Sequence, residues 1–360
     1  MSGSSSKRIS GSSSSSPEKK RKRKPKVFLA VHYGAGRHSK NKEAMYRSLS
    51  DLACRKGLKI LNNNGRADEA VVEAMVVLEN SKKLNAGKGS YLTMNETVEV
   101  DAGFMSGNGK FGGIGAAPGI PNPCLAAKAL ANLEMDVLVS PNLLVGPGAK
   151  SWTASMGLKT CGDEVLICKR AKSAYNKFLE DKSAMSAHTE SDTIGCIALD
   201  ADGHVAASGS TGGGLYKFPG RVGPIAQYGC GIYAEDCSEN STTATAVATT
   251  GTGEYLTELR FAHTCDKLIR EDDTTSSVTA LKKAMDLAAT GRKPRISSLH
   301  APIVGMIGLT WTDGRGEFVV AHNSDNLVYA YTGSMFRDKV IMRYSEKSEN
   351  KNYTLTAFNI

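Results

Sequence analysis

The sequence has few aromatic residues and no long apolar run. Only 6% of its 360 residues are aromatic, and just two of them are Trp. No stretch approaches the roughly 18 uninterrupted apolar residues that a membrane-spanning helix needs, and the N-terminus lacks the apolar centre of a secretory signal peptide. We therefore expect a protein with no membrane segment and no export signal. With 41% hydrophobic residues, it can still bury one large core.

Paired cysteines and familiar ligand spacings are also missing. The eight cysteines include no C-x-x-C pair, and the seven histidines show no metal-ligand or triad spacing. The sequence contains no Walker P-loop, H-E-x-x-H or G-x-S-x-G motif. A literal G-x-G-x-x-G at 107–112 runs into more glycines instead of a helix, which argues against dinucleotide binding. These absences predict reduced thiols inside a cell and no catalytic metal.

Positive charge is concentrated at one end of the chain. Residues 19–26 read Lys-Lys-Arg-Lys-Arg-Lys-Pro-Lys, which supplies most of the net charge of +9. The remainder is nearly balanced, so no nucleic-acid-binding face is indicated. Residues 1–26 are too poor in apolar side chains to fold and are predicted to be a disordered basic tail. Such a run is typical of a nuclear localisation signal or a loose polyanion contact, and a merely solvated tail is the alternative. The expected locations are nucleus and cytoplasm.

Hydrophobic periodicity predicts a helix-rich first half and a second half of hairpins and helices. A buried strand is predicted at Val27–Val31 and an N-cap at Asp68. Predicted helices cover 42–61, 68–80, 123–134, 147–157, 164–182, 253–270 and 276–289. Predicted hairpins pair 193–199 with 204–208 and 304–312 with 317–322. Adjacent hairpins favour antiparallel sheet with helices on its outer faces. The two textures meet at the polar residues 183–192.

Three segments of the second half carry candidate chemistry. The first is Ser191-Asp192-Thr193-Ile194-Gly195, a polar loop that runs directly into a strand. The second combines Ser210-Thr211-Gly212-Gly213 with Gly220-Arg221-Val222-Gly223, and the third is Ala248-Thr249-Thr250-Gly251-Thr252-Gly253-Glu254. Each alone has a structural explanation as a strand start, turn or helix entry. Their significance lies in their combination and order.

Together with His32-Tyr33-Gly34-Ala35-Gly36, Leu84–Ser90 and Glu99-Val100-Asp101-Ala102, these segments resemble the asparaginase-like family of N-terminal nucleophile hydrolases. Within it, the taspase branch is the most similar. The resemblance implies an α+β fold, a four-layer αββα sandwich. It further implies an α half at 27–192 and a β half at 193–360, separated by self-cleavage between Asp192 and Thr193.

The resemblance also assigns roles. An internal threonine hydroxyl is a poor nucleophile, but cleavage before Thr193 frees an α-amino group that can act as its base at neutral pH. Thr211 would orient that nucleophile, and the Thr250 hydroxyl with the Gly251 N–H would stabilise the oxyanion. Arg221 would grip a substrate carboxylate through its bidentate guanidinium. Gly223, Gly253 and Asn85 are expected to line the substrate site.

Two details favour a peptidase over a small-molecule amidase. Asparaginases of this family commonly carry a carboxylate three residues after the arginine, to receive the substrate's α-ammonium group, whereas this chain has Pro224 there. The chain also presents Asp192 at its own scissile bond, where many asparaginases have glycine. We therefore expect a threonine endopeptidase that cleaves proteins after aspartate, with an L-asparaginase or isoaspartyl peptidase as the alternative. Thr211, where taspases have serine, weakens this preference.

The expected partners are polypeptide substrates, without direct contact to nucleic acid or membrane. The resemblance suggests an α/β heterodimer that pairs into a dimer of heterodimers. It implies no catalytic cofactor, although related enzymes can hold a structural sodium ion on backbone carbonyls of the segment matching Leu78–Gly89. A non-catalytic interaction protein on a retired hydrolase scaffold is the remaining alternative. It would predict loss of the nucleophile or oxyanion donors, and all four of Thr193, Thr211, Thr250 and Gly251 are present.

Overall fold

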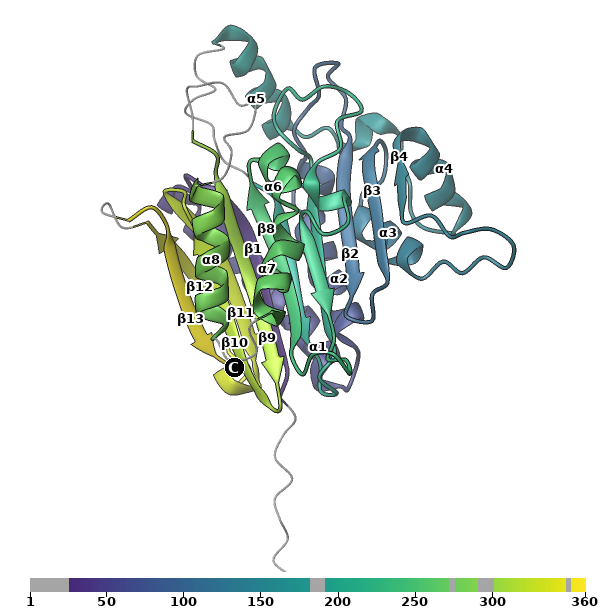
Figure 1. Cartoon of the computed structure of the whole chain (residues 1–360). Helices are drawn as coiled ribbons and strands as arrows, with labels where there is room; N and C mark the ends of the chain where they lie inside the picture. Colours follow the sequence, from purple (N-terminus) through teal and green to yellow (C-terminus); the bar gives the residue numbers. More distant parts are fainter. Residues whose placement is uncertain (1–25, 182–191, 272–275, 291–300, 348–350) are drawn as a thin grey trace, which may run out of the picture.

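The computed structural model describes residues 26–181, 192–271, 276–290, 301–347 and 351–360. In these parts of the chain, two β-sheets stack face to face between two layers of helices (Figure 1). The predicted α+β four-layer αββα sandwich is confirmed. Apart from Lys26, the predicted basic tail lies outside the described residues, as do residues 183–191 of the predicted linking loop. None of the helices described here combines the length and apolarity needed to cross a bilayer.

The two sheets are built almost wholly from antiparallel neighbours; β3 and β4 are the parallel pair. The larger sheet has eight strands in the spatial order β12 (Ile341–Glu346), β11 (Asn326–Gly333), β1 (Phe28–Gly36), β5 (Ile194–Leu199), β6 (Val205–Thr211), β2 (Val100–Ser106), β3 (Phe111–Ala117) and β4 (Leu143–Val145). The smaller sheet has five, in the order β13 (Thr354–Asn359), β10 (Arg315–His322), β9 (Val304–Thr312), β8 (Ala244–Gly251) and β7 (Ile232–Glu235).

The helices fall into two groups, one for each sheet. The larger sheet carries α1 (Glu43–Asn62), α2 (Ala67–Glu79), α3 (Pro123–Ala131) and α4 (Gly146–Ser155), and α5 (Lys169–Glu180) extends beyond it at the top of Figure 1. The smaller sheet is covered by α6 (Gly253–Leu259), α7 (Phe261–Arg270) and α8 (Ser277–Thr290).

The central position of β1 explains why its first four residues, Phe28–Val31, are all apolar. Successive side chains of a strand point to opposite faces, so a strand buried on both faces needs apolar residues at every position. Leu29 and Val31 join the core between the larger sheet and its helices. Phe28 and Ala30 join the second core, which lies between the sheets and extends to α7 and α8. This central strand therefore ties the two cores together.

Several predicted boundaries are corrected by the structure. Asp68 is not the N-cap of α2, which begins at Ala67 after Arg66. The predicted helix at 253–270 breaks at Arg260, whose φ of 44° is left-handed, into α6 and α7. The predicted helix at 164–182 begins only at Lys169. Strands β2, β3, β4 and β13 were not predicted.

The glycine-rich stretch at 107–119 forms part of the β2–β3 hairpin. Gly112 and Gly113 are strand residues, and a Cβ on either would collide with the backbone carbonyl of Ala127 or Ala226. These glycines therefore allow a helix and a turn to pack directly against the sheet. The literal G-x-G-x-x-G match opens no helix.

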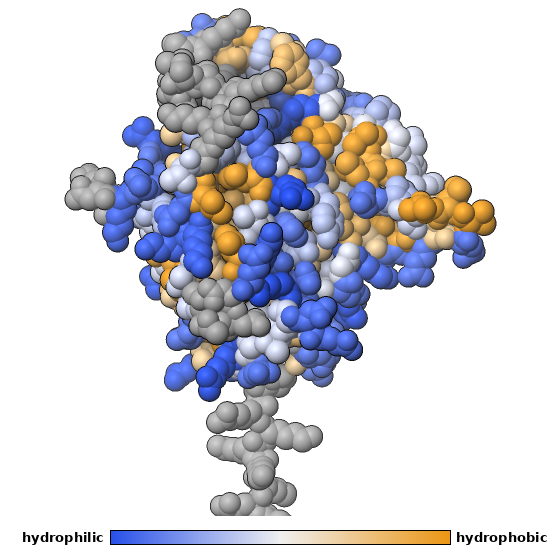
Figure 2. Space-filling model, in the orientation of Figure 1, coloured by the Kyte–Doolittle hydropathy of each residue, from blue (hydrophilic) through white to orange (hydrophobic). Residues whose placement is uncertain are grey.

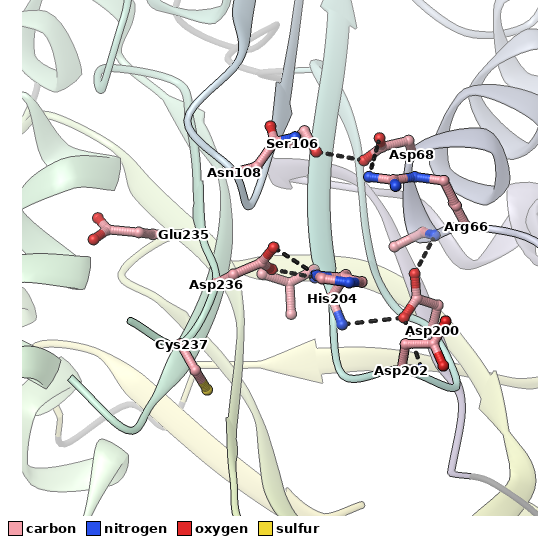
Figure 3. Close-up of polar contacts among 12 residues, drawn as sticks. Arg66, Asp68, Ser106, Asn108, Asp200, Asp202, His204, Glu235, Asp236 and Cys237 are labelled. Carbon is pink, nitrogen blue, oxygen red and sulfur yellow. Dashed lines mark hydrogen bonds and ion pairs between the residues drawn. The ribbon is translucent and has the colours of Figure 1, made fainter. Parts of the chain in front are cut away.

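A polar cluster closes the strand ends that lie opposite the site described below (Figure 3). Asp200, in the β5–β6 turn, accepts a hydrogen bond from the Ala67 N–H at 3.0 Å and so caps α2 from a distant part of the chain. Asp236, after β7, accepts from His204 Nδ1 and from the Val205 N–H, both at 2.8 Å. The cluster thus ties α2, the β5–β6 hairpin and the end of β7 together.

One apolar segment lies outside both cores. Between α3 and β4, the chain projects at the right of Figure 1 and is orange in Figure 2. Val137 and Val139 are 91% and 95% exposed. These side chains therefore contribute nothing to the packing of the described fold.

We predict that the His204–Asp236 pair makes stability depend on pH. The hydrogen bond to Asp236 raises the pKa of His204. The pair's contribution is therefore full below the unfolded-state pKa of about 6.5 and is lost as pH rises through the folded-state value. Because 48% of the His204 side chain is exposed, we expect at most about 1 kcal/mol. Thermal unfolding of wild type and His204→Gln should differ by up to about 3 °C at pH 5.5 and less at pH 9. A difference that grows with pH would contradict this account.

Candidate active site

The predicted catalytic residues meet where strands of both sheets end. Thr193 immediately precedes β5, and Thr211 is the last residue of β6. Since Ile194 pairs with Ser210 across these strands, Thr193 and Thr211 lie beside each other. Thr250 and Gly251 end β8 in the facing sheet. All four line one pocket of about 260 Å³. Residues far apart in sequence are thus brought to one site.

The surroundings of Thr193 include a neutral histidine that the motif search did not single out. His32, on β1, is fully buried and opposite Gly195 of β5, where a Cβ would collide with the imidazole. Burial lowers the pKa of His32 to about 3, against an opposing hydrogen bond with the Thr193 backbone. A neutral imidazole does not repel a cation. His32 therefore leaves a freed Thr193 amine able to hold and release a proton near neutral pH.

Thr250 and Gly251, the predicted oxyanion donors, are held at the end of β8, where both line the pocket. The Thr250 hydroxyl accepts a hydrogen bond from the Ala35 N–H at 3.3 Å, which orients its oxygen. Gly251 has φ of 142°, and a Cβ there would collide with the carbonyl of Ile303. Only glycine meets both conditions easily. The conformation of the chain at the end of β8 therefore depends on glycine at this position.

Asn85 ties a loop of the first half to the end of β6. Its side-chain amide donates to the Gly213 carbonyl at 2.8 Å, and its backbone carbonyl accepts from the Gly212 N–H at 2.8 Å. The Thr211 hydroxyl accepts from the Gly213 N–H at 3.0 Å. Asn85 lines the pocket, as predicted, and also braces the segment that carries Thr211.

Arg221 lines the pocket with a carboxylate beside it. Its Nε and one terminal nitrogen donate to the same oxygen of Glu254, at 3.0 and 2.9 Å. Burial alone would raise the pKa of Glu254, but the facing guanidinium outweighs it and the pKa is lowered. Glu254 is therefore ionised at neutral pH. The site offers a cation and an anion side by side.

The two predicted substrate-site glycines pack against that guanidinium. A Cβ on Gly253 would collide with a terminal nitrogen of Arg221, and one on Gly223 would press on the other. Gly253 lines the pocket, whereas Gly223 is not among its lining residues. The Gly223 N–H donates to Asp101 at 2.9 Å. Gly223 therefore acts on the placement of Arg221 rather than on the pocket wall.

Asp101 is a positioning residue whose role the motif alone did not reveal. Its buried carboxylate accepts from the Ala116 N–H at 2.7 Å and from the Gly223 N–H. Asp101 also pairs with Thr211 across β2 and β6. Its carboxylate thus links β3 to the arginine loop, and its backbone lies beside the end of β6. Its presence in a quoted motif was the available signal.

The segment Leu78–Gly89 fits a sodium ion poorly at two of its carbonyls. The Arg170 guanidinium donates to the Leu84 carbonyl at 3.1 Å and to the Gly89 carbonyl at 2.6 Å. A cationic side chain already satisfies these oxygens, and a sodium ion beside it would be repelled. The Leu84 and Gly89 carbonyls are therefore poor ligands for a sodium ion.

Comparison with known proteins identifies the family of this chain. The asparaginase family model matches residues 25–341. The chain belongs to the asparaginase family. It is 32% identical over 309 residues to a mouse isoaspartyl peptidase/L-asparaginase, covering 84% of this chain and 87% of the relative. It is 31% identical to a plant-type L-asparaginase of Pyrobaculum calidifontis, covering 82% and 93%. An Escherichia coli isoaspartyl peptidase is 33% identical over 64% of this chain and 73% of its own length. As a member of this family, the chain is a hydrolase.

These relatives overturn the prediction of a taspase-type endopeptidase that cleaves proteins after aspartate. They fit the alternative, an isoaspartyl peptidase or L-asparaginase. The structure also shows why Pro224 misled the prediction. Pro224 lines the pocket without a charge, but Glu254 supplies a carboxylate to the same pocket from a different segment. Loss of an acid three residues after Arg221 does not remove the anion from the site.

We predict that Gly253→Ala weakens substrate binding in this asparaginase-family site. The added methyl would displace the Arg221 guanidinium, so KM should rise by about tenfold or more with a smaller change in kcat. Steady-state kinetics would measure both. Gly148→Ala is the matched control, because a Cβ at Gly148 in α4 meets nothing within 4 Å. Unchanged KM in Gly253→Ala would show that the guanidinium does not contact substrate.

Proposed function

We propose that this chain is an N-terminal nucleophile amidohydrolase that cleaves itself between Asp192 and Thr193. It then hydrolyses the side-chain amide of L-asparagine and the isoaspartyl bond of small peptides. The observation that carries the proposal is the pocket itself. It combines the hydroxyls of Thr193 and Thr250 with the adjacent Arg221 and Glu254.

The first step in this proposal is an internal acyl transfer. In the continuous chain, the Thr193 nitrogen belongs to the peptide bond and cannot act as a base. The Thr193 hydroxyl attacks the Asp192 carbonyl carbon, a C–O bond forms, and the C–N bond breaks as the proton passes to nitrogen. Water then hydrolyses the ester. It leaves a carboxylate on Asp192 and a free α-amine on Thr193.

Substrate turnover then repeats the same chemistry on an external amide. The free Thr193 amine, with an ordinary pKa of about 7.7–8.0, accepts the hydroxyl proton and passes it to the leaving ammonia or amine. Thr211 orients the nucleophile. The Thr250 hydroxyl and the Gly251 N–H receive the oxyanion, a role worth about 2.7–4 kcal/mol for one donor. Water resolves the acyl-enzyme.

The charged pair accounts for the choice of substrate. L-Asparagine and an N-terminal isoaspartyl residue both carry an α-carboxylate and an α-ammonium group next to a side-chain amide. Arg221 suits the carboxylate and Glu254 suits the ammonium. The names of the relatives point to the same two substrates. No protein substrate is required by this arrangement.

We further propose that residues 27–192 and 193–360 stay associated after cleavage as an α/β heterodimer. Strand β5 of the second half lies between β1 and β6, and β2 of the first half follows β6. Separating the halves would break several strand pairs at once. The dimer of heterodimers and the location in nucleus and cytoplasm stay predictions, the latter resting on the basic tail.

Thr193→Ala should remain a single chain, because the variant lacks the attacking oxygen. Purified wild type should migrate as two fragments, residues 1–192 and 193–360. Denaturing electrophoresis and N-terminal sequencing of the smaller fragment provide the measurement. A wild-type preparation that stays intact indefinitely would remove the proposed base and contradict the mechanism.

Glu254→Gln should impair turnover of L-asparagine more than that of N-acetyl-L-asparagine, which keeps the carboxylate but lacks the ammonium. We expect a fall in kcat/KM of at least about tenfold for the free amino acid. Arg221→Ala should impair both substrates while self-cleavage continues. Glu134→Gln, at a side chain 85% exposed, is the control. Equal losses on the two substrates would refute the role of Glu254.

A further inference from the structure

A partly buried arginine links α5 to the loop that carries Asn85. Arg170 lies in the first turn of α5, and its guanidinium bridges the carbonyls of Leu84 and Gly89. Both hydrogen bonds come from one terminal nitrogen, which holds the guanidinium against this loop. Arg170 is not among the residues that line the active-site pocket. Its other contact is with the ring of Tyr91.

The guanidinium stacks on Tyr91, which reaches the scissile bond. The centre of the Arg170 guanidinium lies 4.8 Å from the Tyr91 ring centroid, within the range of a cation–π contact. The Tyr91 hydroxyl donates to a carboxylate oxygen of Asp192 at 3.4 Å. The Tyr91 N–H also donates to the Asn85 side chain at 2.8 Å, so the ring is held from its backbone as well.

We propose that Tyr91 and Arg170 form a clamp that holds the Asp192 side chain so that its carbonyl faces the Thr193 hydroxyl during self-cleavage. The inference rests on the proposed self-cleavage at this bond. Both are positioning residues for maturation, because neither touches the reacting atoms. The clamp holds Asp192, the residue on the acyl side of the scissile bond. Asp192 takes no part in the proposed substrate turnover.

The electrostatics of the pocket give the clamp its purpose. Asp192 is 92% buried and lines the same pocket as Thr250 and Gly251. A carboxylate turned toward these donors would compete for their hydrogen bonds and repel the oxyanion that forms at its own carbonyl. One oxygen of this carboxylate accepts from the Tyr91 hydroxyl, and the nearby Arg170 cation attracts the carboxylate toward the same side. Drawing the carboxylate toward Tyr91 and Arg170 would reduce its repulsion of the oxyanion during self-cleavage.

Tyr91→Phe removes only the hydroxyl and is the primary test. Full-length chain is made by cell-free translation, and conversion to two fragments is followed over time by electrophoresis. We expect self-cleavage to slow by at least about fivefold, as one modest hydrogen bond to a charged group implies. The matched control is Tyr175→Phe in α5, which loses a hydroxyl bonded to the Met94 carbonyl at 3.1 Å and should mature at the wild-type rate.

Two further variants separate positioning from general damage. Arg170→Lys keeps the charge but loses the planar guanidinium that lies over the Tyr91 ring, and it should slow maturation as well. If the hydroxyl acts through the Asp192 carboxylate, the effects of Tyr91→Phe and Asp192→Ala on the rate should be non-additive. Once fully processed, Tyr91→Phe should turn over L-asparagine within about twofold of wild type.

The outcomes are distinct. If wild type self-cleaves and Tyr91→Phe self-cleaves at the same rate, the clamp is overturned and the proposed function is unaffected. Equal losses in maturation and in turnover of processed enzyme would also overturn it, because they indicate a general structural effect. A wild-type chain that never self-cleaves would overturn the proposed function and the clamp with it.

Discussion

The position of β5 inside the larger sheet is the constraint on which the active site depends. This strand pairs with β1 on one side and β6 on the other, and every one of its residues is buried. Its first backbone atoms therefore cannot shift without disturbing both cores. Thr193 stands directly before that strand and inherits its rigidity. In the proposed mechanism, Thr193 is thus held in place both before and after the bond that precedes it is cleaved.

The rest of the site is assembled by short bridges from other elements. Asn85 braces the segment after β6, and Asp101 fixes the loop of Arg221 through a backbone N–H. Gly223 and Gly253 leave room for the guanidinium, and Glu254 pairs with it. Most of these contacts are buried hydrogen bonds with polar partners, which hold geometry tightly when fully satisfied. The polar cluster around Asp236 gives the opposite strand ends a similar closure (Figure 3).

Much of this architecture could be predicted from local sequence, and the exceptions have physical causes. Apolar periodicity located most helices and the hairpins around Asp200 and Asp313 because those signals are local. The start of α2 was misplaced because its cap comes from Asp200, far along the chain. Strands β2 and β3 were missed because their glycines serve close packing, not side-chain patterning.

Site residues followed the same division. Motifs named Thr193, Thr211, Thr250 and Gly251, and the fold brings them into one pocket. Sequence spacing could not reveal that Glu254 faces Arg221 across 33 positions, so Pro224 was given a significance that the pocket does not support. That pairing exists only in three dimensions. It also changes the substrate that the pocket fits.

The most direct test of the central claim is the intact mass of the 193–360 fragment during turnover. Processed enzyme mixed with L-asparagine and quenched rapidly in acid should contain a population of this fragment heavier by one aspartyl group. Peptide mapping should place that group on the Thr193 side chain. The account predicts this ester, and its absence from enzyme treated with buffer that contains no L-asparagine. Rapid turnover with the aspartyl group on another residue would contradict Thr193 as the nucleophile.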